Sequence, residues 1–97
     1  MYSVAIADDE TNIREGLRDL IDWHGLGFAL TGVFDDGNGL VSLLQKSPPD
    51  LIVTDIRMNH CSGLDVSQYI QQHRLSTRVI LISSYKEADL AMSAIKY

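Results

Sequence analysis

The stretch Val4-Ala5-Ile6-Ala7-Asp8-Asp9-Glu10 runs from four apolar residues straight into three acidic ones. Two later stretches repeat the arrangement: Leu51-Ile52-Val53-Thr54 leads into Asp55, and Val79-Ile80-Leu81-Ile82 leads into Ser83. Short apolar runs rich in Val and Ile are typical of strands buried on both faces, as in a parallel sheet covered by helices. The carboxyl ends of such strands meet at one edge of the sheet, where ligands bind. We therefore expect the polar residues that follow the three runs to lie together.

The residues expected at this edge are Asp8, Asp9, Asp55 and Ser83. A single aspartate after a strand is most often a solvated loop residue, and that is the alternative for each of them. Three carboxylates brought together repel one another unless a cation lies among them. Hard oxygen ligands with a hydroxyl nearby suit Mg²⁺ and a phosphoryl group. The combination therefore predicts a site for magnesium and a phosphoryl group.

The composition is that of one acidic domain. The 97 residues carry a net charge of −5 and a pI near 4.9, which argues against direct binding to nucleic acid or to an anionic membrane surface. No apolar run approaches the roughly 20 residues of a membrane-spanning helix. The N-terminus enters the first strand at once, so we expect no signal peptide. Cys61 is the only cysteine and cannot form an internal disulfide, which favours a cytoplasmic location.

Strand and helix patterns alternate along the chain. Apolar residues at helical spacing over 13–21 predict a first helix, capped by Asn12 and closed by Gly25 and Gly27. Ser62, followed three residues later by an aspartate, predicts a second capped helix start. The remaining predicted elements are a strand over 28–34, a turn over 35–39, helices within 40–44, 64–70 and 87–97, and a strand opened by Arg78. Four strand–helix pairs predict a doubly wound α/β fold.

These residues resemble the receiver domain of bacterial two-component response regulators. The acidic pair Asp8-Asp9, the strand-end Asp55 with Met58 and Gly63 after it, and Ser83 follow that family's order, spacing and strand context. A finer likeness connects the chain with receivers fused to AraC-type helix-turn-helix output domains. It rests on the segments 14–17 (REGL), 21–23 (IDW), 26–28 (LGF) and 54–58 (TDIRM).

The resemblance covers residues 2–97 and implies a flavodoxin-like parallel sheet with strand order 2-1-3-4. The chain stops at the end of its last predicted helix, where this fold normally continues into a fifth strand and a fifth helix. We therefore interpret residues 1–97 as one receiver domain, truncated at its C-terminus, with no output domain in this chain.

The resemblance also implies a chemistry for the strand-end residues. Asp55 is the expected phosphoacceptor, which takes a phosphoryl group from a phosphohistidine of a sensor histidine kinase. Asp9 and Asp55 are expected to bind Mg²⁺ directly and Asp8 through a water molecule, with the backbone carbonyl of Arg57 as a further ligand. The hydroxyl of Ser83 is expected to bind a phosphoryl oxygen and to move on phosphorylation.

The chain departs from the family pattern at two places. Asn59 stands where the family usually has proline, and its amide is expected near the phosphoryl group. The family's phosphoryl-binding lysine ends a fifth strand, and neither Lys86 nor Lys96 occupies its position. Tyr85 has two interpretations: a residue that flanks the phosphoryl site, or an exposed aromatic at the entry of a helix.

The leading interpretation is a phosphorylation-controlled switch rather than an enzyme, although such a domain can catalyse its own phosphorylation and dephosphorylation. Its expected partners are a sensor kinase and, only through an output domain outside this chain, DNA. One alternative is an interaction module of the same fold that forms a homodimer without phosphorylation; the retained carboxylates disfavour it. A haloacid-dehalogenase-like phosphatase needs a second aspartate where this chain has Arg57. A flavodoxin-like cofactor binder needs a Ser/Thr/Gly-rich loop where Asp8-Asp9-Glu10 would repel a phosphate.

Overall fold

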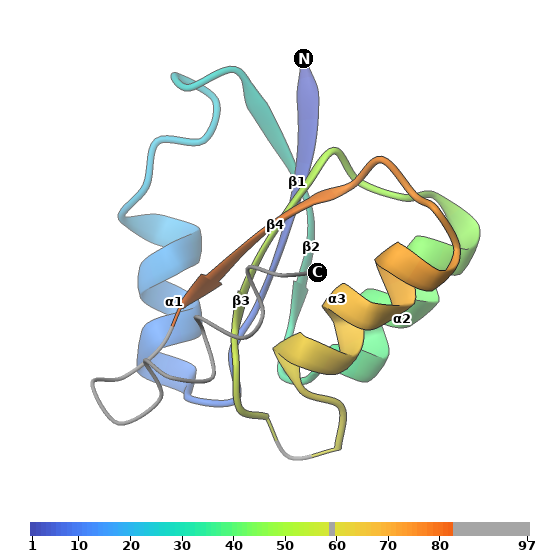
Figure 1. Cartoon of the computed structure of the whole chain (residues 1–97). Helices are drawn as coiled ribbons and strands as arrows, with labels where there is room; N and C mark the ends of the chain where they lie inside the picture. The colour runs from blue at the N-terminus through green and yellow to red at the C-terminus, as the bar shows by residue number, and fades with distance from the viewer. Residues whose placement is uncertain (59, 83–97) are drawn as a thin grey trace.

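A computed structural model describes residues 1–58 and 60–82 of the chain. The elements in this part are β1 (Tyr2–Ala7), α1 (Thr11–Asp19), β2 (Phe28–Phe34), α2 (Gly37–Lys46), β3 (Leu51–Asp55), α3 (Gly63–Gln72) and β4 (Arg78–Ile82). The strands form a parallel sheet with the order β2-β1-β3-β4 (Figure 1). The predicted doubly wound fold and its strand order are therefore confirmed for these residues. The helix predicted over 87–97 lies outside the described residues.

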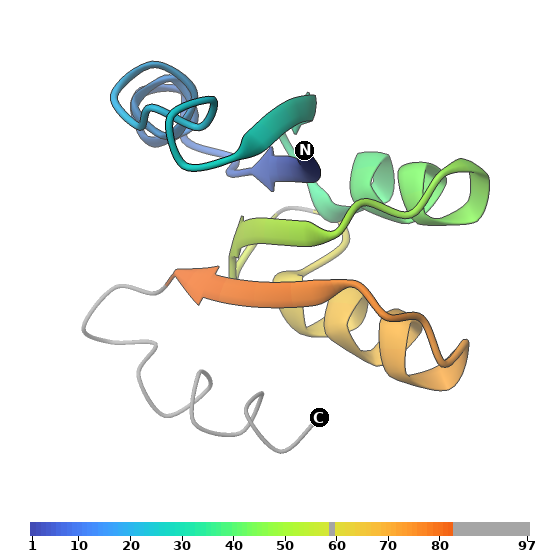
Figure 2. The same cartoon turned by 90° about the horizontal axis from the view of Figure 1, so that it is seen from above.

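The sheet separates two apolar cores. Helix α1 covers one face, and α2 and α3 cover the other (Figures 1 and 2). Alternate residues of β1 serve the two sides: Val4 and Ile6 pack toward α1, whereas Ala5 and Ala7 pack toward α2 and α3. All four of these residues are fully buried. A strand covered on both faces has no solvent side, which explains why the run 4–7 lacks polar alternation.

The first helix corrects the sequence prediction at both ends. Helix α1 begins at Thr11, and its N-cap is Glu10 rather than Asn12. The physical reason is the turn after β1: the Asp8 carboxylate accepts a hydrogen bond from the Glu10 N–H at 2.9 Å and starts the helix earlier. The helix also ends at Asp19, well before the glycines that were expected to close it.

The segment between α1 and β2 is held by Trp23 instead of by a longer helix. The indole N–H of Trp23 donates to the backbone carbonyl of Leu17 at 2.8 Å. Its ring meets Phe28 edge-on, with ring centroids 6.2 Å apart. These contacts fold the chain back under α1, so apolar residues that fit a helical spacing in sequence belong to a turn in the fold.

The start of α3 confirms the predicted cap. The Ser62 hydroxyl accepts from the Asp65 N–H at 3.1 Å, and the Asp65 carboxylate accepts from the Ser62 N–H at 3.0 Å, which completes a capping box. Helix α2 starts at Gly37, where the sequence predicts a turn, because the Asp36 side chain caps it by accepting from the Asn38 N–H at 2.8 Å. Both caps lie close after strand ends, so they set how the loops leave the carboxyl edge of the sheet.

Candidate functional site

Three carboxylates gather at the carboxyl edge of the sheet, which is the lower edge in Figure 1. Asp8 and Asp9 follow β1 and Asp55 ends β3, and the pairing of Ala7 with Thr54 places these strand ends side by side. One carboxylate oxygen from each aspartate lies within 4.8 Å of those from the other two. The structure thus brings together the acidic residues that the strand-end pattern places at one edge.

Asp8 is the buried member of this acidic cluster. Its side chain is 3% exposed, whereas Asp9 and Asp55 are half-buried. Burial raises the pKa of the Asp8 carboxyl above its ordinary value, the Glu10 N–H hydrogen bond opposes that rise, and the negative charges of Asp9 and Glu10 add to it. Arg14 offers little relief to the carboxylate, since its Nη1 donates to the Asp8 backbone carbonyl, at 2.8 Å.

We expect Asp8→Asn to stabilise the metal-free protein at pH 7. Because its folded-state pKa is raised, Asp8 contributes stability that is complete below its unfolded-state pKa, about 4, and is lost as pH rises through the folded-state pKa. The asparagine carbonyl can still accept from Glu10, so the substitution should raise the free energy of unfolding at pH 7 by about 0.5–1 kcal/mol. Urea unfolding at pH 7 and pH 4, with a chelator present, measures this gain.

The same variant should lose part of any magnesium-dependent rise in melting temperature, because one carboxylate of the cluster is gone. Two results would contradict this account of Asp8 as a carboxylate whose charged form is destabilised by burial. One is an Asp8→Asn variant less stable than the natural protein at pH 7, and the other is a variant that Mg²⁺ stabilises as much as it stabilises the natural protein.

The loop between β3 and α3 is anchored at several main-chain positions. The Ile56 N–H donates to the Ile82 carbonyl at 3.1 Å, and the Gly63 N–H donates to the Ile56 carbonyl at 2.8 Å. Further along, the Gly37 N–H of α2 donates to the Cys61 carbonyl at 3.0 Å. The backbone that carries Arg57 is therefore tied to β4, α3 and α2. A metal ligand role for the Arg57 carbonyl stays a prediction.

Three predicted phosphoryl-site residues, Asn59, Ser83 and Tyr85, lie outside the described residues. Sequence reasoning in turn assigned no role to two residues that contact the site backbone, Arg14 and Thr54. Arg14 gave no signal that separates it from other helix arginines. Thr54 did give one, because it places a hydroxyl at the end of an otherwise apolar buried run.

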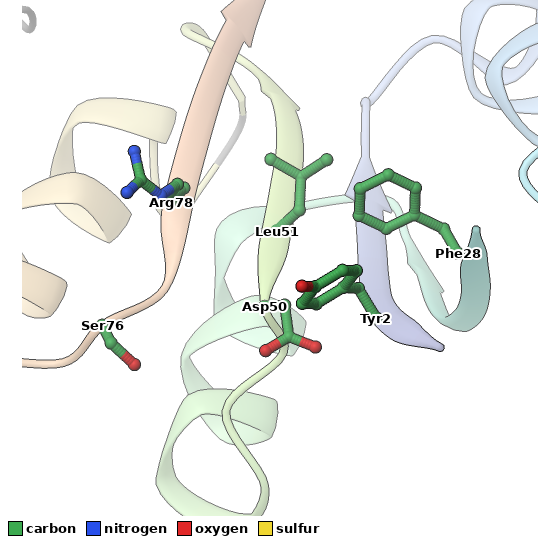
Figure 3. A pocket seen from close by; sticks show the side chains of 6 residues that line it. All are labelled: Tyr2, Phe28, Asp50, Leu51, Ser76 and Arg78. Carbon is green, nitrogen blue, oxygen red and sulfur yellow. The ribbon is translucent and has the colours of Figure 1, made fainter. Parts of the chain in front are cut away.

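A pocket of about 350 Å³ lies at the opposite, amino edge of the sheet. Figure 3 shows Tyr2 and Phe28 on one side of Leu51 and Arg78 on the other. The carboxylate that lines this pocket belongs to Asp50 and already serves the fold. It accepts hydrogen bonds from the Ser3 N–H at 2.7 Å and from the Ser3 hydroxyl at 3.2 Å. The residues lining the pocket are Tyr2, Phe28, Asp50, Leu51, Ser76 and Arg78. The acidic cluster is therefore the better candidate for the functional site.

The donor set of the cluster fits a hard divalent cation. Its ligand atoms are carboxylate oxygens from Asp8, Asp9 and Asp55, the ligand type that Mg²⁺ and Ca²⁺ prefer. Magnesium needs only one or two direct carboxylates, because it keeps several of its waters. Asp9 and Asp55 are only half-buried, so solvent reaches part of the cluster.

Comparison with protein families decides which kind of domain this is. The family model of the response regulator receiver domain matches residues 4–97. The chain belongs to this family. Within residues 1–58 and 60–82, the receiver domain contains no helix long and apolar enough to cross a membrane.

Curated relatives and solved structures agree with this assignment. The receiver domain is 37% identical over 97 residues to the transcriptional regulatory protein HptR of Staphylococcus aureus, covering 100% of this chain and 38% of HptR. It is similar to a two-component transcriptional regulator AraC from Clostridium phytofermentans, with a TM-score of 0.87, 31% identity, and coverage of 100% of this chain and 75% of the other. A LuxR-family DNA-binding response regulator from Staphylococcus aureus has the same TM-score of 0.87 at 27% identity, with coverage of 99% and 79%.

The receiver domain thus spans about 38% of the length of the curated relatives that it matches. Both AraC and LuxR names occur among its structural neighbours. The family match therefore assigns these residues to a receiver domain and assigns no output function to a whole protein.

Proposed function

We propose that this receiver domain is the phosphoacceptor module of a two-component response regulator, with Asp55 as the phosphoacceptor. The observation that carries the proposal is the acidic cluster: the half-buried carboxylate at the end of β3 lies beside the two carboxylates that follow β1. Three carboxylates placed together repel one another at a cost in stability, and a bound divalent cation would offset that cost. We assign residues 1–97 to one receiver domain.

The chemistry requires a nucleophilic carboxylate and neutralisation of charge. A carboxylate oxygen of Asp55 attacks the phosphorus of a phosphohistidine, the new O–P bond forms as the N–P bond breaks, and the leaving imidazole keeps the electron pair and takes up a proton. Asp9 and Asp55 would hold Mg²⁺ directly, Asp8 would hold it through water, and the Arg57 carbonyl would supply a further oxygen. When bound, Mg²⁺ would neutralise charge between the carboxylate and the phosphoryl oxygens.

The remaining residues of the proposal bind the phosphoryl group and pass the signal on. The Asn59 amide and the Ser83 hydroxyl would donate hydrogen bonds to phosphoryl oxygens. Movement of Ser83 toward the phosphoryl group would link the site to the segment that follows β4. In this proposal the domain acts in the cytoplasm and its cognate partner is a sensor histidine kinase. The regulated partner is a DNA-binding output domain of the whole protein, with AraC-type the favoured class.

Phosphoryl transfer from acetyl phosphate tests this function without knowledge of the kinase. The intact protein is incubated with acetyl phosphate and either MgCl₂ or a chelator, and its mass is then measured. We expect one phosphoryl group per chain with Mg²⁺ and none with the chelator, and release of that group by hydroxylamine, which cleaves acyl phosphates.

Two other outcomes would count against the proposal. A magnesium-dependent rise in melting temperature without any phosphoryl group would leave a metal-binding domain that does not accept phosphate. If acetyl phosphate adds no phosphoryl group and MgCl₂ does not change the melting temperature, the phosphorylation-independent interaction module is favoured. Size-exclusion chromatography would then test whether that module forms a homodimer.

A further inference from the structure

Thr54 places a hydroxyl where the fold needs only an apolar side chain. It lies in β3, paired with Ala7 of β1 and Leu81 of β4, and its side chain is 0% exposed. Valine has the same branched shape, suits a strand equally well and has no hydroxyl to remove from water. Because an unbonded buried hydroxyl is unfavourable, its presence here points to a specific contact.

The Thr54 hydroxyl reaches the turn that follows β3. Its Oγ1 donates to the backbone carbonyl of Asp55 at 3.1 Å and lies 3.7 Å from the Sδ of Met58. These two acceptors stand on either side of Arg57, whose carbonyl is a proposed metal ligand. One buried hydroxyl therefore joins the two ends of the turn that carries this ligand.

Gly63 restrains the same carbonyl of Asp55. A Cβ at Gly63 would collide with the Asp55 carbonyl oxygen, so the start of α3 lies directly against the Asp55 backbone. The Gly63 N–H also holds the next carbonyl, that of Ile56, at 2.8 Å. The backbone of the phosphoacceptor is thus held between the Thr54 hydroxyl and the first residue of α3.

We propose that Thr54 is a positioning residue for phosphoryl acceptance. Its hydroxyl sets the turn after Asp55, and so sets where the Arg57 carbonyl lies relative to the Asp55 carboxylate. This inference rests on the proposed function. Removing the hydroxyl removes two contacts of the turn but leaves the nucleophile in place, so the expected defect lies mainly in the magnesium dependence of phosphorylation.

A pair of substitutions separates positioning from packing. Thr54→Val keeps the shape of the side chain without the hydroxyl, whereas Thr54→Ser keeps the hydroxyl without the methyl group. We expect Thr54→Val to raise the MgCl₂ concentration for half-maximal phosphorylation by acetyl phosphate about tenfold, which is the effect of one hydrogen bond. Thr54→Ser should stay within about threefold of the natural protein. In urea unfolding, Thr54→Ser should have the lower free energy of unfolding of the two variants, since serine loses buried apolar surface.

The decisive result is that the variant that needs more MgCl₂ for half-maximal phosphorylation is not the less stable one. If Thr54 had only a structural role, the less stable variant would also be the more impaired in phosphorylation. If Thr54→Val is phosphorylated with unchanged magnesium dependence, or if Thr54→Ser is the more impaired variant, the positioning role is wrong and the proposed function stands. If the natural protein itself takes up no phosphoryl group, the proposed function fails, and this inference fails with it. All measurements use the intact protein.

Discussion

Replacement of Asp55 by asparagine is expected to abolish phosphoryl incorporation. The amide is close in size to the carboxylate but lacks the nucleophilic oxygen anion, so no acyl phosphate can form. We expect incorporation from acetyl phosphate with MgCl₂ to fall from about one group per chain to below detection, a loss of at least about 100-fold. Intact mass spectrometry of both proteins after equal incubation measures this loss.

Asp35→Asn is the matched control for this experiment. Asp35 also follows a strand at the same edge of the sheet, directly after β2, but it does not belong to the acidic cluster of the described residues. The Asp35→Asn variant should therefore take up as much phosphoryl group as the natural protein. Melting temperatures without Mg²⁺ show that both variants fold. If Asp55→Asn still gained a phosphoryl group at the natural rate, the acceptor would have to be another residue.

Gly63→Ala is expected to lower both stability and phosphorylation. Gly63 is buried at the start of α3, and a Cβ there would collide with the backbone carbonyl oxygen of Asp55 and lie 3.0 Å from a methyl carbon of Leu81. A backbone atom cannot yield as the end of a flexible side chain can, so α3 or the turn after β3 must move. Overpacking of this kind lowers the free energy of unfolding by about 1–3 kcal/mol. Because the displaced backbone carries the proposed phosphoacceptor, phosphorylation should fall as well.

Gly16→Ala makes the same chemical change with the opposite expected sign. Gly16 lies within α1, where the nearest atom to a new Cβ is a methyl carbon of Leu20 at 3.7 Å, an ordinary contact. Alanine restricts the unfolded chain and favours the helix, so this variant should gain about 0.5–1 kcal/mol. Urea unfolding of both variants measures the contrast. A Gly63→Ala protein as stable and as readily phosphorylated as the natural one would show that α3 does not restrain Asp55.

The parallel sheet and the meeting of its acidic residues follow from the order of residues along the chain. The unbroken run Val4–Ala7 requires a strand without a solvent face, and the carboxyl ends of parallel strands share one edge whatever the detailed packing. Asp8, Asp9 and Asp55 could therefore be placed together before any contact was known. The Ser62 cap could be predicted as well, because a capping box is formed by residues three positions apart.

The tertiary structure alone decided which carboxylate is buried, where α1 begins and ends, and what the Thr54 hydroxyl does. The burial that raises the pKa of Asp8 is a sum over atoms from several elements, and no local pattern contains it. Trp23 ends the helical region early because Leu17 and Phe28 are in reach only once the chain has turned back. Gly63 contacts the Asp55 carbonyl because α3 returns to the end of β3. Desolvation and close packing act between residues distant in sequence, so they take effect only when the fold has brought those residues together.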